Sequence, residues 1–178
     1  DTVKPVLAQV TAVTTPTNVT TPSYVFSSNE AGTNSYGGSC GSSTTSATSS
    51  GDNTVILTQP DNSTALSDAS YSNCTITVTD SAGNASTALN VNTFVVDTTA
   101  PTVDNVSSST TDGNYFPGEN IIITVSFSEN VIVDNSSGNP LIQLETDSTD
   151  QYATYASGNS STVLSFLYTV RSEDNSSD

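Results

Sequence analysis

The side chains best suited to chemistry in this sequence are carboxylates placed singly at the ends of predicted strands. A hard divalent cation such as Ca²⁺ takes roughly six to eight oxygen ligands, so two or three carboxylates, supplemented by backbone carbonyls and water, can hold one. The expected chemistry is therefore the binding of Ca²⁺. The candidate metal ligands are Asp1, Glu30, Asp80, Asp97 and Glu129.

Two of these residues belong to a repeated segment. The sequence Asp97-Thr98-Thr99-Ala100-Pro101 matches the opening Asp1-Thr2-Val3-Lys4-Pro5 at an offset of 96 residues, about the length of a small β-sandwich. Proline fixes φ and pushes the preceding residue toward extended geometry, so each copy is a short, stiff connector. We expect two tandem β-domains, 1–97 and 98–178, with Asp97 as a cation ligand at the hinge. A turn or capping role for Asp97 is the alternative.

The elements that must position these carboxylates are β-strands, because the apolar residues occur in short alternating runs. In the clearest run, Cys74, Ile76 and Val78 point inward while the threonines between them point outward. The segment Asp80–Asn84 then predicts a tight turn, since Gly and Asn supply unusual backbone angles. A second alternating run, in the second domain, comprises Ile121, Ile123, Val125 and Phe127.

The loops between these strands are expected to gather the carboxylates. In a β-sandwich of immunoglobulin type, the loop after the second strand and the loop before the last strand lie at the pole of the incoming linker. This topology predicts one group made of Asp1, Glu30 and Asp80, and a second made of Asp97 and Glu129. For Asp80, a plain Asx turn that needs no ion is the alternative.

The charge balance is strongly acidic, with a formal net charge of −16 from 18 acidic and two basic residues. Nucleic acid is not an expected partner, because phosphate contacts need a basic patch. The acids are spread through loops, which also fits a role in solubility or in salt adaptation. No apolar run reaches the length of a membrane span and no signal peptide is recognisable, so membrane insertion is not expected.

Both cysteines, Cys40 and Cys74, fall in the first domain. A disulfide between them is expected in a Ser/Thr/Asn-rich β-protein of an oxidising compartment; two buried free thiols are the alternative. The bridge would close a loop of about 33 residues and stabilise the domain by about 3–4 kcal/mol on the chain-entropy account.

The second domain lacks the closing segments of the first. No second turn of the form Asp80-Ser81-Ala82-Gly83-Asn84 follows, and no last strand is recognisable before Asp178. We therefore expect a second sandwich that is incomplete at its C-terminus. Its open edge would be completed by following sequence or by strand addition from a neighbouring identical subunit in a homopolymer.

Six segments carry a shared pattern: Tyr24–Thr33, Tyr71–Asn84, Phe94–Pro101, Thr111–Tyr115, Ile123–Val131 and Leu141–Thr146. Together they resemble the bacterial Ig-like tandem repeats of large extracellular surface proteins. The resemblance implies an all-β fold of two tandem immunoglobulin-like sandwiches, a cell-surface or extracellular location in adhesins, stalks or filaments, and frequent stiffening by interdomain Ca²⁺. The missing end of the second repeat departs from the pattern.

Catalysis has little support in the residue types. The absence of His removes Ser-His-Asp and Cys-His pairs, so an enzyme is not expected. Tyr71 invites comparison with the tyrosine corner of immunoglobulin domains, although it precedes Cys74 by three residues rather than two. Surface glycans are a possible addition at eight sequons, which begin at Asn18, Asn62, Asn73, Asn84, Asn105, Asn135, Asn159 and Asn175.

These features favour a non-enzymatic structural subunit or repeat of an extracellular filament, tube or sheath, assembled by strand pairing and stiffened by Ca²⁺. A rigid stalk segment of a giant cell-surface adhesin is the first alternative. A glycan-binding module is the second, although such a module should show an exposed aromatic cluster, which the sequence does not indicate.

Overall fold

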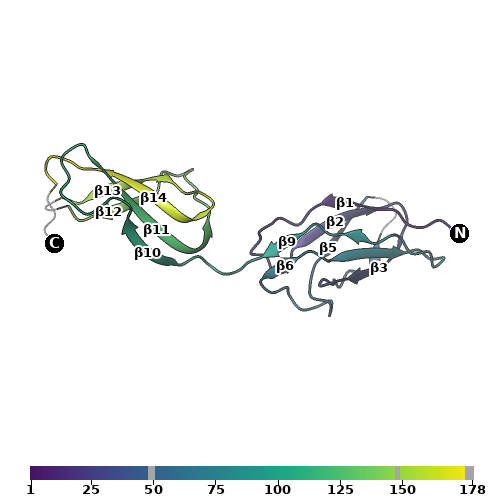
Figure 1. The fold of residues 1–178 in the computed structure, drawn as a ribbon. Coiled ribbons are helices and arrows are strands. Elements are labelled where there is room, and N and C mark those ends of the chain that lie inside the picture. Colours follow the sequence, from purple (N-terminus) through teal and green to yellow (C-terminus); the bar gives the residue numbers. More distant parts are fainter. Residues whose placement is uncertain (48–50, 147–148, 175–178) are drawn as a thin grey trace. The chain divides into compact units, whose positions relative to one another are not determined.

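The computed structural model describes residues 1–47, 51–146 and 149–174, and no helix occurs in these ranges. The chain is all-β and divides into two compact units, Asp1–Thr99 (unit 1) and Ala100–Asp178 (unit 2), each shown in Figure 1. The boundary falls two residues after the one expected from the repeated Asp-Thr-x-x-Pro segment.

The described residues of unit 1 form nine short strands in two larger sheets and one small one. One sheet has the order β1-β2-β5, the second has the order β4-β3-β7-β8, and β6 pairs with β9. The strands are β1 (Leu7–Thr11), β2 (Ser23–Ser28), β3 (Gly32–Gly37), β4 (Ser46–Ala47), β5 (Asp52–Ile56), β6 (Ala69–Tyr71), β7 (Thr75–Thr79), β8 (Leu89–Asn90) and β9 (Phe94–Val96).

The core of unit 1 lies between these sheets, as in a β-sandwich. Strands β2 and β5 contribute Tyr24, Phe26 and Val55, and β7 contributes Ile76 and Val78; all five side chains are 0 % exposed. The inward-facing alternation expected for β7 is confirmed, because its threonines are only half-buried. Burial of these large side chains is the main stabilising term of the unit.

The expected disulfide between Cys40 and Cys74 is formed, with Cα atoms 5.2 Å apart. Cys74 immediately precedes β7, and Cys40 follows β3, the strand with which β7 pairs. Both cysteines are buried in the core. The bridge therefore fastens β7 to the loop that leaves its neighbouring strand.

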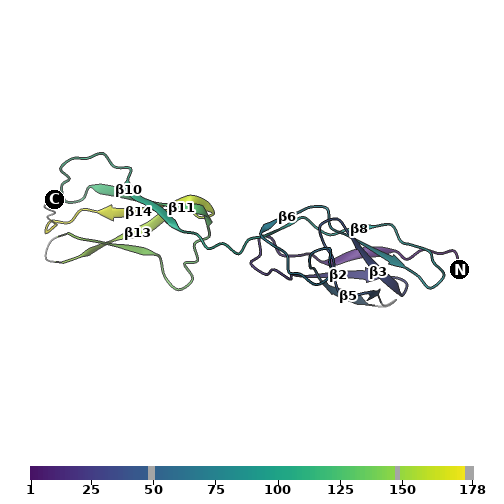
Figure 2. The ribbon, with the colours of Figure 1, turned by 90° about the horizontal axis from the view of Figure 1, so that it is seen from below.

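In unit 2 the residues that the structure describes form one antiparallel sheet of five strands in the order β10-β11-β14-β13-β12. Its long central strands, β11 and β14, lie side by side in both Figure 1 and Figure 2. Within the described residues, β10 and β12 are its edges. The strands are β10 (Val103–Ser108), β11 (Asn120–Val131), β12 (Leu141–Leu144), β13 (Gln151–Ser157) and β14 (Ser161–Thr169).

One face of the unit 2 sheet carries its apolar core. Cross-strand partners point to the same side of a sheet, so the pairs Ile123–Phe166 and Val125–Leu164 place the alternating run of β11 opposite that of β14. We call this side the inner face. Its buried members are Val125, Ala153, Leu164, Phe166 and Tyr168, with a further ring of half-buried side chains around them.

Candidate metal centre

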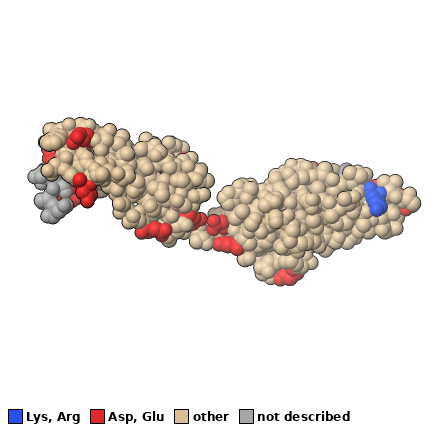
Figure 3. Space-filling view, in the orientation of Figure 1, with Lys and Arg blue, Asp and Glu red and all other residues tan. Residues whose placement is uncertain are grey.

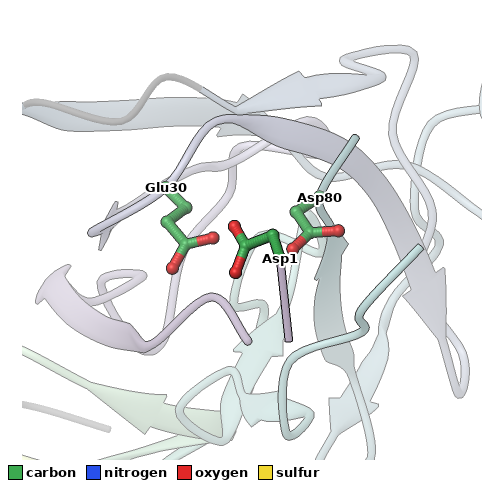
Figure 4. Close-up of side chains that lie close together, drawn as sticks. All are labelled: Asp1, Glu30 and Asp80. Carbon is green, nitrogen blue, oxygen red and sulfur yellow. The ribbon is translucent and has the colours of Figure 1, made fainter. Parts of the chain in front are cut away.

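Three of the five predicted ligands meet at one pole of unit 1. The carboxylate oxygens of Asp1, Glu30 and Asp80 lie within 4.8 Å of one another. In the close-up of Figure 4, the Asp1 side chain lies between the other two. Asp1 is exposed, whereas Glu30 and Asp80 are half-buried. The grouping expected from the sandwich topology is therefore present in the structure.

The fold explains why three residues that are far apart in the sequence meet there. Asp1 and Glu30 are separated by 29 positions, and Glu30 and Asp80 by 50. Glu30 lies in the turn that joins β2 to β3, and Asp80 directly follows β7. Strands β3 and β7 are antiparallel neighbours, with Thr33 opposite Thr79, so the start of β3 and the end of β7 lie at the same pole. The N-terminal segment reaches this pole because β1 pairs with β2 and Leu7 lies opposite Ser28.

Asp1 is held in place by local and long-range hydrogen bonds. Its Oδ1 accepts a hydrogen bond of 2.8 Å from the backbone N–H of Val3, which fixes an Asx-type turn. Its backbone carbonyl accepts a hydrogen bond of 3.3 Å from the side-chain amide of Asn84.

Glu30 is positioned by the residues that precede it. The backbones of Val6 and Asn29 are linked, because the Asn29 N–H donates to the Val6 carbonyl over 3.3 Å. In return the Val6 N–H donates to Asn29 Oδ1 over 2.6 Å. The Ser28 hydroxyl donates to the Glu30 carbonyl over 2.6 Å. These bonds fix the turn backbone and leave the Glu30 carboxylate directed toward Asp1 (Figure 4).

Asp80 organises the turn after β7. Its Oδ1 accepts hydrogen bonds of 2.8 Å from the backbone N–H groups of Ala82 and Asn84, and its Oδ2 accepts one of 2.9 Å from the Asn84 amide. Gly83 adopts a positive φ of 89°, as expected from the sequence. The Asn84 amide, followed by the backbone donors, lowers the pKa of Asp80 and keeps its carboxylate ionised.

This arrangement has the chemistry of a hard-cation site. The three carboxylates offer oxygen ligands only, which suits Ca²⁺ rather than a softer metal. The carboxylates repel one another, and a divalent cation between them would remove that repulsion. The Asx turn at Asp80 is also present, so the turn and the ligand interpretations of this residue are compatible.

The second predicted group, Asp97 with Glu129, stays a prediction because the two residues belong to different units. The Asp97 carboxylate accepts a hydrogen bond of 3.1 Å from the Thr99 N–H, the same i to i+2 contact that Asp1 makes. Glu129 follows Ser128, whose N–H donates to the Thr102 carbonyl while its hydroxyl oxygen accepts from the Thr102 N–H, both over 3.0 Å. In unit 1, Val6 of the incoming segment is hydrogen-bonded to Asn29, the residue before Glu30. In unit 2, Thr102 of the incoming segment is hydrogen-bonded to Ser128, the residue before Glu129.

One carboxylate with a clear structural role has no recognisable signal in the sequence. Asp68 accepts hydrogen bonds from the hydroxyls of Thr98 and Thr99, over 2.8 and 3.1 Å. The Thr98 hydroxyl is the main cause of the lowered pKa of Asp68. These contacts fasten the end of unit 1 to the loop before β6. Asp68 precedes Thr98 by 30 positions and Thr99 by 31, so no local sequence pattern indicates these hydrogen bonds.

The remaining acids form no second group of this kind in the described ranges. On the face drawn in Figure 3 they are scattered over both units. Among the described residues there is also no helix with the length and apolarity needed to cross a membrane. Of the predicted sequons, the last, at Asn175, lies outside the described residues.

Comparison of the chain with protein-family models, with curated protein sequences and with solved structures finds no match.

Proposed function

We propose that this chain is a non-enzymatic structural repeat of an extracellular filament, tube or sheath, stiffened by Ca²⁺. The observation that carries the proposal is the group formed by Asp1, Glu30 and Asp80 where the incoming segment enters unit 1. A cation bound there would join that segment to two loops of the domain. Rigid attachment of a domain to whatever precedes it is the property that a scaffold requires.

The proposal includes an immunoglobulin-like fold for unit 1, which the pairing of its strands supports. Strand β2 pairs with β1 and β5 in one sheet, and β3 pairs with β7 in the other, as in two-sheet sandwiches of that class. The Tyr71 hydroxyl donates to the Ser67 carbonyl over 2.9 Å, which resembles a tyrosine corner at the start of β7. The Tyr71 ring also stacks on Phe94 with centroids 5.1 Å apart.

An extracellular location is the second part of the proposal. Disulfides persist in oxidising compartments, and the Cys40–Cys74 bridge is formed. Ca²⁺ is abundant outside cells, where binding modules work with dissociation constants of roughly 10⁻⁴–10⁻³ M. In this proposal, like subunits associate by strand pairing through unit 2, whose sheet has open edges.

A stalk segment of a surface adhesin is the second candidate, and the fastening of the connector favours it. Asp68 holds Thr98 and Thr99 to unit 1, and Ser128 holds Thr102 to unit 2. Each end of the connector is thus fixed to its own unit. Electron microscopy of the native material separates the two candidates, since a filament or tube is built from many copies whereas a stalk is a single extended polypeptide.

The cation site is tested by thermal unfolding with and without Ca²⁺. At about 10 mM Ca²⁺ the expected dissociation constants predict a rise in the melting temperature of unit 1 of roughly 5–20 °C, reversed by EDTA. Glu30→Gln and Asp80→Asn should reduce this response strongly. The matched control is Asp61→Asn, which also removes a turn carboxylate that lies outside the group.

Two outcomes would contradict the cation site. One is a melting temperature of unit 1 that is the same in Ca²⁺ and in EDTA. The other is a response to Ca²⁺ that Asp61→Asn reduces as much as Glu30→Gln does, since general screening of negative charge would produce that result.

A further inference from the structure

Three loops of unit 2 meet at the end of its sheet opposite the incoming segment. Strands β10, β12 and β14 end at this pole and β11 and β13 begin there, because each strand runs antiparallel to its neighbours. Residues from the loops after β10, β12 and β14 line a hollow with a volume of about 310 Å³. This volume is at the lower end of the range for small-molecule sites, so it suits a ligand no larger than one sugar ring.

The wall of the hollow combines apolar and hydrogen-bonding groups. Ile121, Tyr168 and Val170 line it and also belong to the apolar core of the unit or pack against it. Tyr115, from the loop after β10, adds a second aromatic ring. Asn114, Thr146 and Asp174 add an amide, a hydroxyl and a carboxylate. An apolar wall with a few convergent polar groups is typical of a site that binds an organic ligand.

The loop that carries Tyr115 is fixed by hydrogen bonds. The Tyr115 hydroxyl donates to the carbonyl of Thr111. The Gly118 N–H donates to the Val170 carbonyl over 2.8 Å, and Gly118 adopts a φ of 95°, which glycine reaches without steric cost. The hollow is therefore formed before a ligand enters, and this reduces the conformational entropy that binding must overcome.

The carboxylate of Asp174 has an acceptor that no donor uses. Its Oδ2 accepts hydrogen bonds from the Tyr168 hydroxyl and, over 2.6 Å, from the Arg171 N–H. Its Oδ1 is shielded from solvent and has no hydrogen-bond partner among the described residues. A shielded carboxylate oxygen without a donor is unfavourable, so a ligand hydroxyl that donates to Asp174 gains free energy there.

Asn114 offers the complementary groups. It is exposed, and no hydrogen bond engages its side chain in the part of the chain that the structure describes. Its amide can donate two hydrogen bonds and accept others. A sugar hydroxyl both donates and accepts, so neighbouring hydroxyls of one ring can use Asp174 as acceptor and Asn114 as donor.

A neutral sugar fits these groups better than a charged ligand does. The net charge of −16 disfavours an anion. An ammonium group is less suitable because Arg171 already supplies a positive charge to this part of the unit. That charge lowers the pKa of Tyr168, although burial raises it more. The oxygen of Asp174 thus lacks a hydrogen-bond donor rather than a counter-charge.

An exposed aromatic ring lies next to Tyr115 in the chain. Phe116 is 69 % exposed, the highest value among the described aromatic side chains. The sequence alone does not indicate an aromatic cluster, because Tyr168 is far from Tyr115 and Phe116 along the chain; the fold brings Tyr115 and Tyr168 to one hollow. Aromatic rings of this kind pack against the C–H groups of sugars, as glycan-binding surfaces require.

We propose that this pole of unit 2 binds a neutral sugar residue of a glycan. Asp174 accepts a hydrogen bond from one sugar hydroxyl, Asn114 donates to a neighbouring hydroxyl, and the Tyr115 ring packs against the C–H face of the sugar. Phe116 is available to a sugar residue linked to the first. The inference goes beyond the proposed scaffold function, because it gives the chain an adhesive site that does not involve the carboxylates of unit 1.

The test is a titration of the full, ¹⁵N-labelled chain followed by amide NMR. The probes are glucose, galactose, mannose and N-acetylglucosamine, each added in the presence of EDTA. At least one sugar should shift the amide signals of residues 113–115 and 170–174. The shifts should saturate with a dissociation constant of roughly 1–10 mM, as for a small ligand that makes few contacts.

Matched variants test the assigned contacts. Asn114→Ala should weaken binding by roughly three- to tenfold, because it removes one hydrogen bond from an exposed side chain without disturbing the fold. The control is Asn105→Ala, which truncates an exposed asparagine of β10 outside the hollow and should leave binding unchanged. Asp174→Asn should weaken binding by roughly tenfold or more, because hydrogen bonds to charged groups are stronger.

Four results would overturn the proposal. The first is no shift with any of the four sugars at about 50 mM, well above the expected dissociation constants. The second is a set of shifts confined to other parts of the chain. The third is a stronger response of the same signals to tetramethylammonium, which would identify a cation site. The fourth is equal weakening by Asn105→Ala and Asn114→Ala. Because EDTA is present throughout, none of these results bears on the cation site of unit 1.

Discussion

Removal of the disulfide is expected to destabilise unit 1 selectively. The bridge joins Cys40 to Cys74 across a sequence separation of 34 residues. On the chain-entropy account, opening a loop of this length lowers the free energy of unfolding by about 3–4 kcal/mol, because the denatured chain gains conformations while the folded chain does not. Since a domain of this size is typically stable by about 5–15 kcal/mol, the loss is a large share of the total.

The assay is differential scanning calorimetry of the Cys40→Ala, Cys74→Ala double variant beside the parent protein. For a domain of roughly 100 residues, the expected loss corresponds to a fall in melting temperature of roughly 12–30 °C. Unit 2 contains no cysteine and serves as an internal control, so its transition should not move. Reduction of the parent protein should lower the unit 1 transition to a similar extent.

Two results would refute this account of the disulfide. A fall of less than about 1 kcal/mol would mean that the denatured chain gains little freedom when the loop opens. A fall of equal size in both transitions would mean that the two units do not unfold as separate bodies.

Three further changes test local features of the structure. Gly38→Ala should lower the free energy of unfolding, measured by urea denaturation, by more than about 2 kcal/mol, because φ is 75° and the new Cβ would collide with the Asn73 carbonyl. Gly83→Ala, at a positive φ in open space, should lower it by about 1 kcal/mol. Equal losses would contradict the steric explanation. Burial, together with the hydrogen bond to the Asp174 carboxylate, raises the pKa of Tyr168 to about 12. The folded state therefore holds the phenol proton of Tyr168 more tightly than the unfolded state does. The resulting stabilisation is complete below pH ~10 and lost as the pH rises through about 12, so Tyr168→Phe should flatten the alkaline fall in stability seen by circular dichroism. Hydrogen bonds from the Thr64 hydroxyl and from backbone N–H groups lower the pKa of Asp61 to about 2, so the stabilisation from its carboxylate is present above pH ~4 and lost as the pH falls through about 2. The difference in unfolding free energy between Asp61→Ala and the parent protein should therefore shrink over that range. A difference that stays constant would exclude the carboxylate as its cause.

Local patterns predicted much of the secondary structure. The alternation at Cys74, Ile76 and Val78 identified β7 and its buried face, because the side chains of a strand alternate with a period of two residues. The turn at Asp80 was also readable, since its hydrogen bonds reach only two to four residues along the chain. Given one expected topology, the grouping of Asp1, Glu30 and Asp80 followed from the positions of three loops.

Contacts between distant segments were not readable in the same way. The hydrogen bonds of Asp68 with Thr98 and Thr99 form because the loop before β6 lies beside the last residues of unit 1. No spacing of residues in the sequence indicates that proximity. The strand order of unit 2, and hence the exposure of Val103 on the inner face, depends on which strands become neighbours.

The sequence by itself determined that this protein is made of β-strands, where two of its turns lie and which two cysteines could join. Those properties depend on residues close together in the chain. Only the tertiary structure decided that Asp68 holds Thr98 and Thr99 and that the sheet of unit 2 leaves Val103 exposed on its inner face. Both depend on the pairing of strands far apart in sequence, and pairing is selected by the burial of whole faces rather than by any short segment.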